Sequence, residues 1–219
     1  MITIRNAQKK DKNFIASSMV KASGGICEYL LSDIIAGIGV DRLLSFEIGK
    51  DHSPLSYKNC LIGEDKNGTD AGVVCAYDAE DFKMQLTNIP NTKRAAVNKF
   101  YSAYFPGKSL YIDTVFVSEK HQRKGIATQL LMHVNTFDLH SYQFLTLYVW
   151  ETNLAAISLY EKFGFQVLST HRSDNDNFPI SDKRLLMHCK INTYETHVKK
   201  LKNKGVSLLS STLSSHDTV

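Results

Sequence analysis

The stretch that decides the fold begins with LYIDTVFV, residues Leu110–Val117, and ends with KFGF, residues Lys162–Phe165. The first run is rich in β-branched and aromatic residues, and this composition predicts a strand. A polar link follows, and a helix-period pattern then starts at Gln122 and continues to about Leu139. A strand that leads through a Gly-containing loop into a helix is suited to hold phosphate. The first N–H groups of a helix have no helical partner, and the helix dipole favours negative charge there.

A second strand and a second helix complete this central stretch. The apolar run Phe144–Trp150 predicts the strand. The segment Asn153–Phe165 predicts a helix that Asn153 caps and that a glycine ends. Ala156 and Tyr160 share a face of this helix with Asn153. A single Tyr on an amphipathic helix indicates packing more often than catalysis, so a role for Tyr160 depends on the neighbouring motif.

The hexapeptide QRKGIA, residues Gln122–Ala127, has the composition of a phosphate-binding turn. A pyrophosphate must approach the backbone closely, and Gly125 and Ala127 are small, while Arg123 and Lys124 add positive charge. The hexapeptide lacks the Gly-Lys-Ser/Thr of a P-loop and the three small residues of the dinucleotide pattern. Taken alone, it is equally compatible with a polar turn that merely starts a helix.

Length and composition limit the class of protein. The chain has 219 residues, of which 43% are hydrophobic and 22% charged, as in a single globular domain with appendages. Its net charge of +4 suits an anionic ligand but is low for a nucleic-acid-binding protein. The N-terminus has no signal-peptide pattern, and the most apolar segment, Ile26–Val40, is too short and too polar to span a bilayer. We therefore expect a cytoplasmic protein that contacts neither membrane nor nucleic acid.

The cysteines and histidines predict no metal site. The four cysteines are widely spaced and form no C-x-x-C pair, which argues against a disulfide framework and a zinc site and favours reduced thiols. The eight histidines show no ligand spacing with carboxylates. His121, which precedes the hexapeptide, is expected at the surface, and Trp150 is expected in the core or in the wall of a cleft.

The remaining chain predicts further strands and helices around the central stretch. The expected strands are residues 2–5, 60–62, 73–77, 165–170 and 185–191, and the expected helices are residues 11–22, 26–35, 40–46 and about 95–104. The dipeptide Asn67-Gly68 supplies the positive-φ residues of a hairpin between the second and third strands. We expect one domain over residues 1–192. Residues 193–219 are expected to form one or two basic helical turns and then a Ser/Thr-rich tail.

Taken together, the two motifs resemble the GCN5-related N-acetyltransferase (GNAT) superfamily. The pattern Val117-x4-Gln122-x-x-Gly125-x-Ala127 precedes, after a strand, Asn153-x-x-Ala156-x3-Tyr160-x3-Gly164-Phe165, in the order and at the separation seen in that family. The order of strands and helices from Ile2 to Ile191 also fits. The common form of the first motif has Arg in place of Gln122, often Gly in place of Arg123, and Gly in place of Ala127. Gln and Ala are accepted alternatives, so these departures bear on cofactor affinity.

The resemblance implies an α/β fold and a binding mode for acetyl-CoA, the co-substrate. The fold would be a mixed, strongly twisted central sheet of about six to seven strands flanked by helices, with the fourth and fifth strands splayed apart. Acetyl-CoA would lie in that opening, with its pantetheine arm on main-chain groups of Val115 and Val117 and its pyrophosphate on the N–H groups of Arg123–Thr128. The cofactor-binding residues that the resemblance implies are Val115, Phe116, Val117, Gln122, Arg123, Lys124, Gly125, Ile126, Ala127, Thr128, Asn153, Ala156 and Tyr160.

Two residues are candidates for proton transfer. The resemblance implies that the Tyr160 hydroxyl stands near the sulfur and protonates the departing thiolate. An amine arrives protonated at neutral pH, and Asp113 is the candidate base that removes its proton, directly or through water. A carboxylate in a central strand is costly unless it is paired or faces a cleft, so an ion pair or a helix cap is an equally good interpretation of Asp113. Glu28, Asp33 and Glu47 are further residues that could line the acceptor side.

We interpret the chain as an N-acetyltransferase that moves the acetyl group of acetyl-CoA to a primary amine of a small molecule or peptide. The attack would be direct, in a ternary complex, because no Cys has a partnering base placed by the sequence. A monomer or a homodimer is expected. The alternative is a non-catalytic acyl-CoA-binding sensor or interaction module with the same fold, and Tyr160 favours the enzyme. A nucleic-acid-binding role for the lysines of residues 199–204 is disfavoured, because no aromatic residues are interleaved with them.

Overall fold

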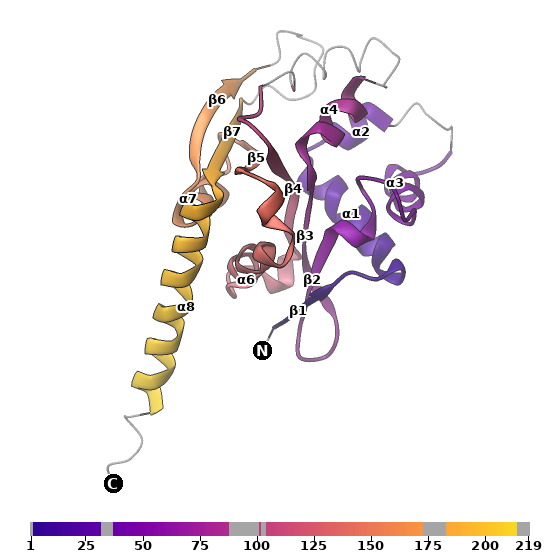
Figure 1. The fold of residues 1–219 in the computed structure, drawn as a ribbon. Coiled ribbons are helices and arrows are strands. Elements are labelled where there is room, and N and C mark those ends of the chain that lie inside the picture. The colour runs from indigo at the N-terminus through magenta and orange to yellow at the C-terminus, as the bar shows by residue number, and fades with distance from the viewer. Residues whose placement is uncertain (1, 32–36, 88–100, 102–103, 173–182, 214–219) are drawn as a thin grey trace.

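Seven strands form a single mixed sheet in the computed structural model, which describes residues 2–31, 37–87, 101, 104–172 and 183–213 (Figure 1). The sheet order is β1-β2-β3-β4-β5-β7-β6, and all neighbouring pairs are antiparallel except β4 and β5. The strands are β1 (Thr3–Asn6), β2 (Cys60–Glu64), β3 (Asp70–Asp78), β4 (Ser109–Val117), β5 (Phe144–Trp150), β6 (Gln166–His171) and β7 (Arg184–Lys190). The predicted α/β class and mixed sheet are therefore confirmed.

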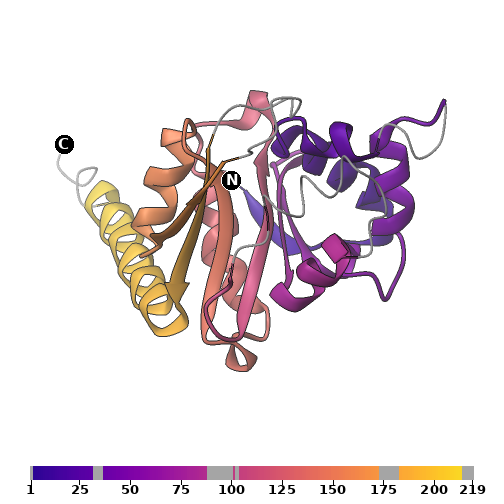
Figure 2. The same cartoon turned by 90° about the horizontal axis from the view of Figure 1, so that it is seen from above.

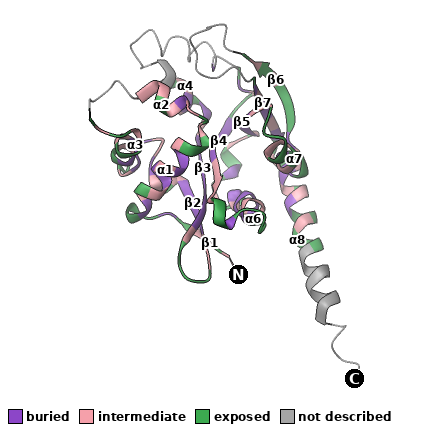
Figure 3. Cartoon of the chain, turned by 180° about the vertical axis from the view of Figure 1, so that it is seen from behind, coloured by how far each residue is buried: buried purple, intermediate pink, exposed green. Residues whose placement is uncertain are grey.

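Helices cover both faces of the sheet, as Figure 2 shows from above. The helices α1 to α4 lie on one face, and α6, α7 and α8 lie on the other. Their bounds are α1 (Lys12–Ala22), α2 (Ile26–Leu31), α3 (Val40–Ile48), α4 (Ala79–Thr87), α6 (Ile126–His133), α7 (Leu154–Lys162) and α8 (Ile191–Leu213). This arrangement buries the central strands on both sides, whereas the edge strand β6 stays largely exposed (Figure 3).

The alternation of side chains along the central strands explains the two cores. Successive strand residues point to opposite faces. Ile62 of β2 and Val73 of β3 therefore pack with α1 and α3, whereas their neighbours Leu61 and Val74 pack with α6. Because both faces are covered, these strands read as continuous apolar runs in the sequence rather than as alternating ones.

β4 and β5 diverge halfway along their length. They pair only where Ser109–Ile112 lies beside Phe144–Leu147. Beyond that point β4 continues beside β3 and β5 continues beside β7. A bulge contributes to the divergence, since Cys75 lies opposite Thr114 and Ala76 lies opposite Ile112, which leaves Asp113 without a partner in the register. The predicted splay of the fourth and fifth strands is confirmed.

Two predicted helices differ from the structure in length, and one helix was not predicted. The helix after the hexapeptide ends at His133 rather than near Leu139, and a hydroxyl of Thr136 caps its last turn by donating to the His133 carbonyl at 2.8 Å. α4 was not predicted, and the helix expected over about residues 95–104 falls almost entirely outside the described residues. α8 is longer than the one or two turns predicted.

The first half of α8 belongs to the core. Tyr194 and Val198 are buried among residues of α6, α7 and β7, and the Tyr194 hydroxyl donates to the Leu131 carbonyl at 2.6 Å. These contacts give the start of the helix a tertiary partner, which its polar sequence alone does not reveal. The division of the chain at residue 192 remains a prediction.

Candidate functional site

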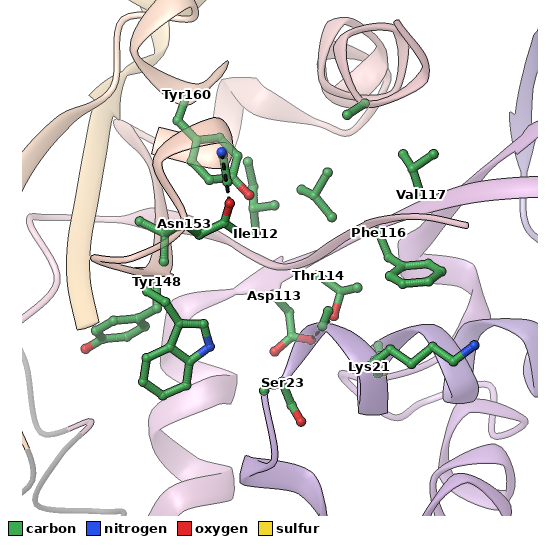
Figure 4. Close-up of a pocket in the computed structure, with 18 of the residues that line it drawn as sticks. Lys21, Ser23, Ile112, Asp113, Thr114, Phe116, Val117, Tyr148, Asn153 and Tyr160 are labelled. Atoms are coloured by element: carbon green, nitrogen blue, oxygen red, sulfur yellow. Dashed lines mark hydrogen bonds between the residues drawn. The ribbon is translucent and has the colours of Figure 1, made fainter. Parts of the chain in front are cut away.

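The divergence of β4 from β5 opens a cavity of about 800 Å³ (Figure 4). Its walls come from the outer half of β4, the turn before α6, one side of α7, the end of β5 and the segment that joins α1 to α2. A cavity of this size holds a small-molecule ligand or the arm of a larger cofactor. It lies at the two motifs that the sequence singled out.

The turn between β4 and α6 has the backbone of an anion-binding site. Arg123 (φ +62°) and Gly125 (φ +76°) are both in the left-handed region, and Gly125 is the N-cap of α6. A Cβ on Gly125 would meet nothing within 4 Å, so the backbone conformation, rather than space, requires glycine. Gly125 and the residues Ile126–Thr128 line the cavity, and their N–H groups lie in the first turn of the helix, where they have no helical acceptor.

The charged and polar side chains of this turn are not equivalent. Arg123 and Gln122 line the cavity, and Gln122 Nε2 donates to the Val117 carbonyl at 3.3 Å. Lys124 does not line the cavity; its Nζ donates to the Lys120 carbonyl at 2.8 Å. Arg123 therefore brings positive charge to the cavity, whereas the Lys124 side chain is held by the preceding turn.

The outer half of β4 presents an open edge to the cavity. Val115 and Val117 pair with β3 on one side, and no ladder to β5 continues beyond Ile112. The residues Val115, Phe116 and Val117 all line the cavity. A strand edge of this kind offers main-chain donors and acceptors to an extended ligand.

Helix α7 brings Asn153, Ala156 and Tyr160 to the opposite wall. Asn153 is the N-cap, as predicted, and its Oδ1 accepts the N–H of Ala156 at 3.1 Å. The Tyr160 ring enters the cavity from α7 (Figure 4), and the residue is only 7% exposed. Burial raises the pKa of the Tyr160 hydroxyl well above its ordinary value, so the hydroxyl keeps its proton at neutral pH.

Asp113 enters the same cavity from the bulge in β4 (Figure 4). Its Oδ1 accepts the hydroxyl of Tyr77 at 3.0 Å, and its Oδ2 accepts the hydroxyl of Thr114 at 2.9 Å. In the described part of the chain it makes no salt bridge and caps no helix. Burial raises the pKa of the Asp113 carboxyl, and the two hydrogen bonds partly oppose that rise. A carboxylate has about four acceptor positions, so two remain for a ligand or a water.

His121 is buried, and the prediction that it lies at the surface is wrong. The residue is 7% exposed; its Nδ1 lies 2.7 Å from Ser118 Oγ, and its Nε2 lies 3.2 Å from Asp65 Oδ2. Asp65 also accepts the N–H groups of Asn67 and Thr69 in the turn between β2 and β3. His121 therefore connects the start of the turn before α6 to this hairpin. Asp65 is distant in sequence, so no local pattern indicated the contact.

Two residues whose role the sequence did not indicate also line the cavity. Arg184, the first residue of β7, and Cys27 of α2 both line it. Trp150 lines it as well, which confirms its place in a cleft wall. Neither Glu28 nor Glu47 lines the cavity, and Asp33 lies outside the described residues.

The described residues contain neither a metal-binding cluster nor a membrane-spanning helix. No group of three or more His, Cys, Asp or Glu side chains is arranged to hold a metal ion there. In the same ranges, no helix combines the length and the apolar character that crossing a bilayer requires.

A protein-family model and several solved structures match the chain. The model of the acetyltransferase (GNAT) family matches residues 50–165. Solved structures that resemble the chain include one described as an acetyltransferase, with 23% identity and a TM-score of 0.61 over 86% of this chain and 99% of that one. An N-acetyltransferase from Staphylococcus aureus Mu50 has 19% identity and a TM-score of 0.62 over 85% and 100% of the two chains.

A third solved structure is spermidine N-acetyltransferase from Vibrio cholerae in complex with CoA and spermine, with 16% identity and a TM-score of 0.55 over 88% and 97% of the two chains. At these identities the likeness establishes the fold alone. No curated protein sequence matches the chain.

Proposed function

Because the chain belongs to the GNAT family of acetyl-CoA-dependent N-acetyltransferases, we propose that it transfers the acetyl group of acetyl-CoA to a primary amine by direct attack in a ternary complex. The observation that carries the proposal is the convergence of three features on one cavity. These are a phosphate-binding turn, an open edge of β4, and a Tyr and an Asp that approach from different elements.

The residues suited to hold acetyl-CoA follow the course of the cavity. The N–H groups of Arg123 and of Gly125–Thr128, at the N-terminus of α6, favour the pyrophosphate. The open edge of β4 at Val115–Val117 offers main-chain groups to the pantetheine arm. Asn153 uses its Oδ1 to cap α7 and keeps its amide N–H groups for the same arm. The residues present therefore fit acetyl-CoA.

Tyr160 is proposed as the general acid. Transfer of the acetyl group breaks the C–S bond and leaves a thiolate, which a proton from a nearby hydroxyl stabilises. The high pKa of the buried Tyr160 keeps that proton in place until the thiolate forms. Burial alone would serve packing equally well, so a variant that lacks only the hydroxyl distinguishes the two roles.

Asp113 is proposed as the general base. The acceptor must lose a proton before its nitrogen can attack the thioester carbonyl. The carboxylate of Asp113 lines the cavity and keeps acceptor positions open, and its raised pKa makes it a stronger base than an exposed Asp.

The environment of Cys27 supports direct attack over an acyl-enzyme. The pKa of its thiol is raised to about 12, mainly by burial and to a smaller extent by the charge of Asp113. A thiol with so high a pKa is almost entirely protonated at neutral pH and is a poor nucleophile. Cys27 is the one cysteine among the cavity-lining residues.

Two measurements test this function. Isothermal titration with acetyl-CoA should show binding, and a CoA-release assay across amine classes should show turnover with at least one class. Failure to bind at high micromolar concentration would remove the basis of the proposal. Binding without CoA release from any amine would instead favour the non-catalytic acyl-CoA-binding module.

A further inference from the structure

Arg184 is a buried cation at the far end of the cavity. It is 7% exposed and lines the cavity wall. Three aromatic rings surround its guanidinium carbon, with centroids at 4.8 Å for Tyr101, 5.2 Å for Tyr148 and 4.8 Å for Trp150. These rings stabilise the positive charge, but they accept none of its in-plane N–H groups in a conventional hydrogen bond.

Among the described residues, the guanidinium has no acidic partner of the kind that a buried arginine ordinarily has. Its Nε and Nη1 are buried without a hydrogen-bond acceptor, and none of the described carboxylates forms a salt bridge with it. The hydroxyl of Tyr148, beside it, is also buried without a partner. Arg5 provides the contrast within this protein, because it contacts Asp11 at 2.6 Å and two further carboxylates. An unpaired buried charge is costly, so Arg184 and Tyr148 mark a place prepared for an anion.

The side chains of Arg184 and Asp113 lie on the same face of the sheet. Tyr111 and Leu186 belong to one cluster on the face that α2 and α4 cover, and strand residues two apart point to the same side. Arg184 precedes Leu186 by two residues, and Asp113 follows Tyr111 by two and accepts a hydrogen bond from Tyr77 of that cluster. The thiol of Cys27 is within electrostatic reach of both charges, which puts them in one region of the cavity.

We propose that the amine acceptor carries a carboxylate and that Arg184 binds it, so the substrate is an amino acid or an amino-acid-like zwitterion with an apolar or aromatic side chain. This inference rests on the proposed acetyl transfer. A guanidinium recognises a carboxylate through parallel charge-assisted N–H bonds. The amino group would then lie toward Asp113, so the two charges of the ligand match the two charges of the cavity. Phe82 and Tyr111, which line the same region, provide the apolar wall.

The test compares matched amines that differ only in the carboxylate. Phenylalanine is paired with phenethylamine and leucine with isoamylamine, and kcat/KM is measured by CoA release. The intact protein should prefer each amino acid by about 10-fold to 100-fold, the range expected for a charge-assisted hydrogen bond. In Arg184→Gln this preference should fall to near 1, and Arg184→Lys should keep part of it. Lys190→Gln removes an exposed cation from the other end of β7 and should leave the preference unchanged.

The outcomes separate this inference from the proposed function. If the intact protein does not bind acetyl-CoA in titration, both the proposed acetyl transfer and the carboxylate site are overturned. Turnover of both members of each pair with equal kcat/KM, or an equal preference in Arg184→Gln, would overturn the carboxylate site alone. If Arg184→Gln does not fold, the proposal is tested by comparing the preference for the amino acid in the intact protein with that in Arg184→Lys. If no amine is turned over, thermal stabilisation of the CoA-bound protein by the amino acids but not by their decarboxylated partners would support the site, and its absence would overturn it.

Discussion

At the scale of single residues, burial in the cavity suits Tyr160 to donate a proton and Asp113 to accept one. Tyr160 is buried and keeps its hydroxyl proton. Asp113 accepts a hydrogen bond on each carboxylate oxygen and is the proposed acceptor of the proton of the amine. Both pKa values are raised mainly by burial. For a phenol this means that the acid form persists, and for a carboxyl it means a stronger base. The same physical cause thus supports both proposed roles.

Tyr160→Phe should reduce kcat by about 100-fold or more, the usual contribution of a positioned general acid. The phenyl ring keeps the packing against Phe165, whose ring centroid lies 5.9 Å away, so the affinity for acetyl-CoA should change little. Single-turnover kinetics and titration with acetyl-CoA measure the two quantities separately. Unchanged turnover would leave Tyr160 a packing residue.

Asp113→Asn should reduce the rate most on the acid side of the pH profile. Below its own pKa the acceptor amine is protonated and needs a base, whereas near and above that pKa the free amine attacks without one. Because burial raises the pKa of Asp113, the acid limb of the intact protein should lie at higher pH than an exposed Asp would give. Profiles of kcat/KM against pH for both proteins check this, and parallel profiles would point to another base.

At the scale of elements, the turn before α6, which is the proposed pyrophosphate site, depends on a backbone conformation and on a contact with the β2–β3 hairpin. Gly125 begins α6 in the left-handed region, and His121 links the turn to Asp65. The helix itself is anchored by Ile126, Leu130 and Leu131, which are buried against the sheet. The N–H groups at the start of α6 are therefore held in place before any anion binds, which lowers the cost of ordering them.

Gly125→Ala should weaken acetyl-CoA binding by about tenfold and cost about 1 kcal/mol of stability, because Ala is strained at positive φ. Gly68→Ala is the matched control. Gly68 has nearly the same φ, +74° against +76°, and neither Cβ would meet an atom within 4 Å. Both variants should lose similar stability in thermal unfolding, but only Gly125→Ala should lose affinity in titration. Equal affinities would mean that this turn does not hold the cofactor.

At the scale of the whole molecule, α8 connects the C-terminal part of the chain to the core on the face opposite α1–α4. Tyr194 stacks on Phe163 with ring centroids 6.1 Å apart, and its hydroxyl reaches the Leu131 carbonyl in α6. The contact joins α6, α7 and α8 into one packed layer. That layer supports the wall of the cavity from which Tyr160 projects.

Tyr194→Phe should lower the free energy of unfolding by about 1 kcal/mol, because the buried hydrogen bond from the Tyr194 hydroxyl is lost, while the Leu131 carbonyl keeps the N–H of Val134 as a partner. Tyr57→Phe is the control, since its hydroxyl bond to Asp51 at 3.2 Å is exposed, and it should change stability by less than about 0.5 kcal/mol. Urea unfolding measures both. A loss in Tyr194→Phe no larger than in the control would mean that α8 contributes little to the core.

Most strands and helices could be predicted from the sequence, because composition and spacing within short segments indicate them. Three segments indicate their structure within a few residues, and the structure agrees with each. They are the β-branched run of β4, the hexapeptide before α6 and the Asn153–Gly164 segment. Helix ends were predicted less well. α6 ends at His133, whose carbonyl accepts a hydrogen bond from the Thr136 hydroxyl. α8 is longer than predicted because Tyr194 packs in the core and donates to the Leu131 carbonyl.

By itself, then, the sequence determined the strands and helices of the α/β class, since these depend on composition and spacing along the chain. Its two motifs resembled a known family, and that resemblance implied the divergent strand pair. Only the tertiary structure decided that His121 is buried against Asp65 and that Arg184 shares a cavity with Asp113. Those partners come from distant segments, and their contacts exist only once the sheet has brought its strands together. A charge reads the same in a sequence whether it is solvated or buried, and the surrounding fold alone determines which it is.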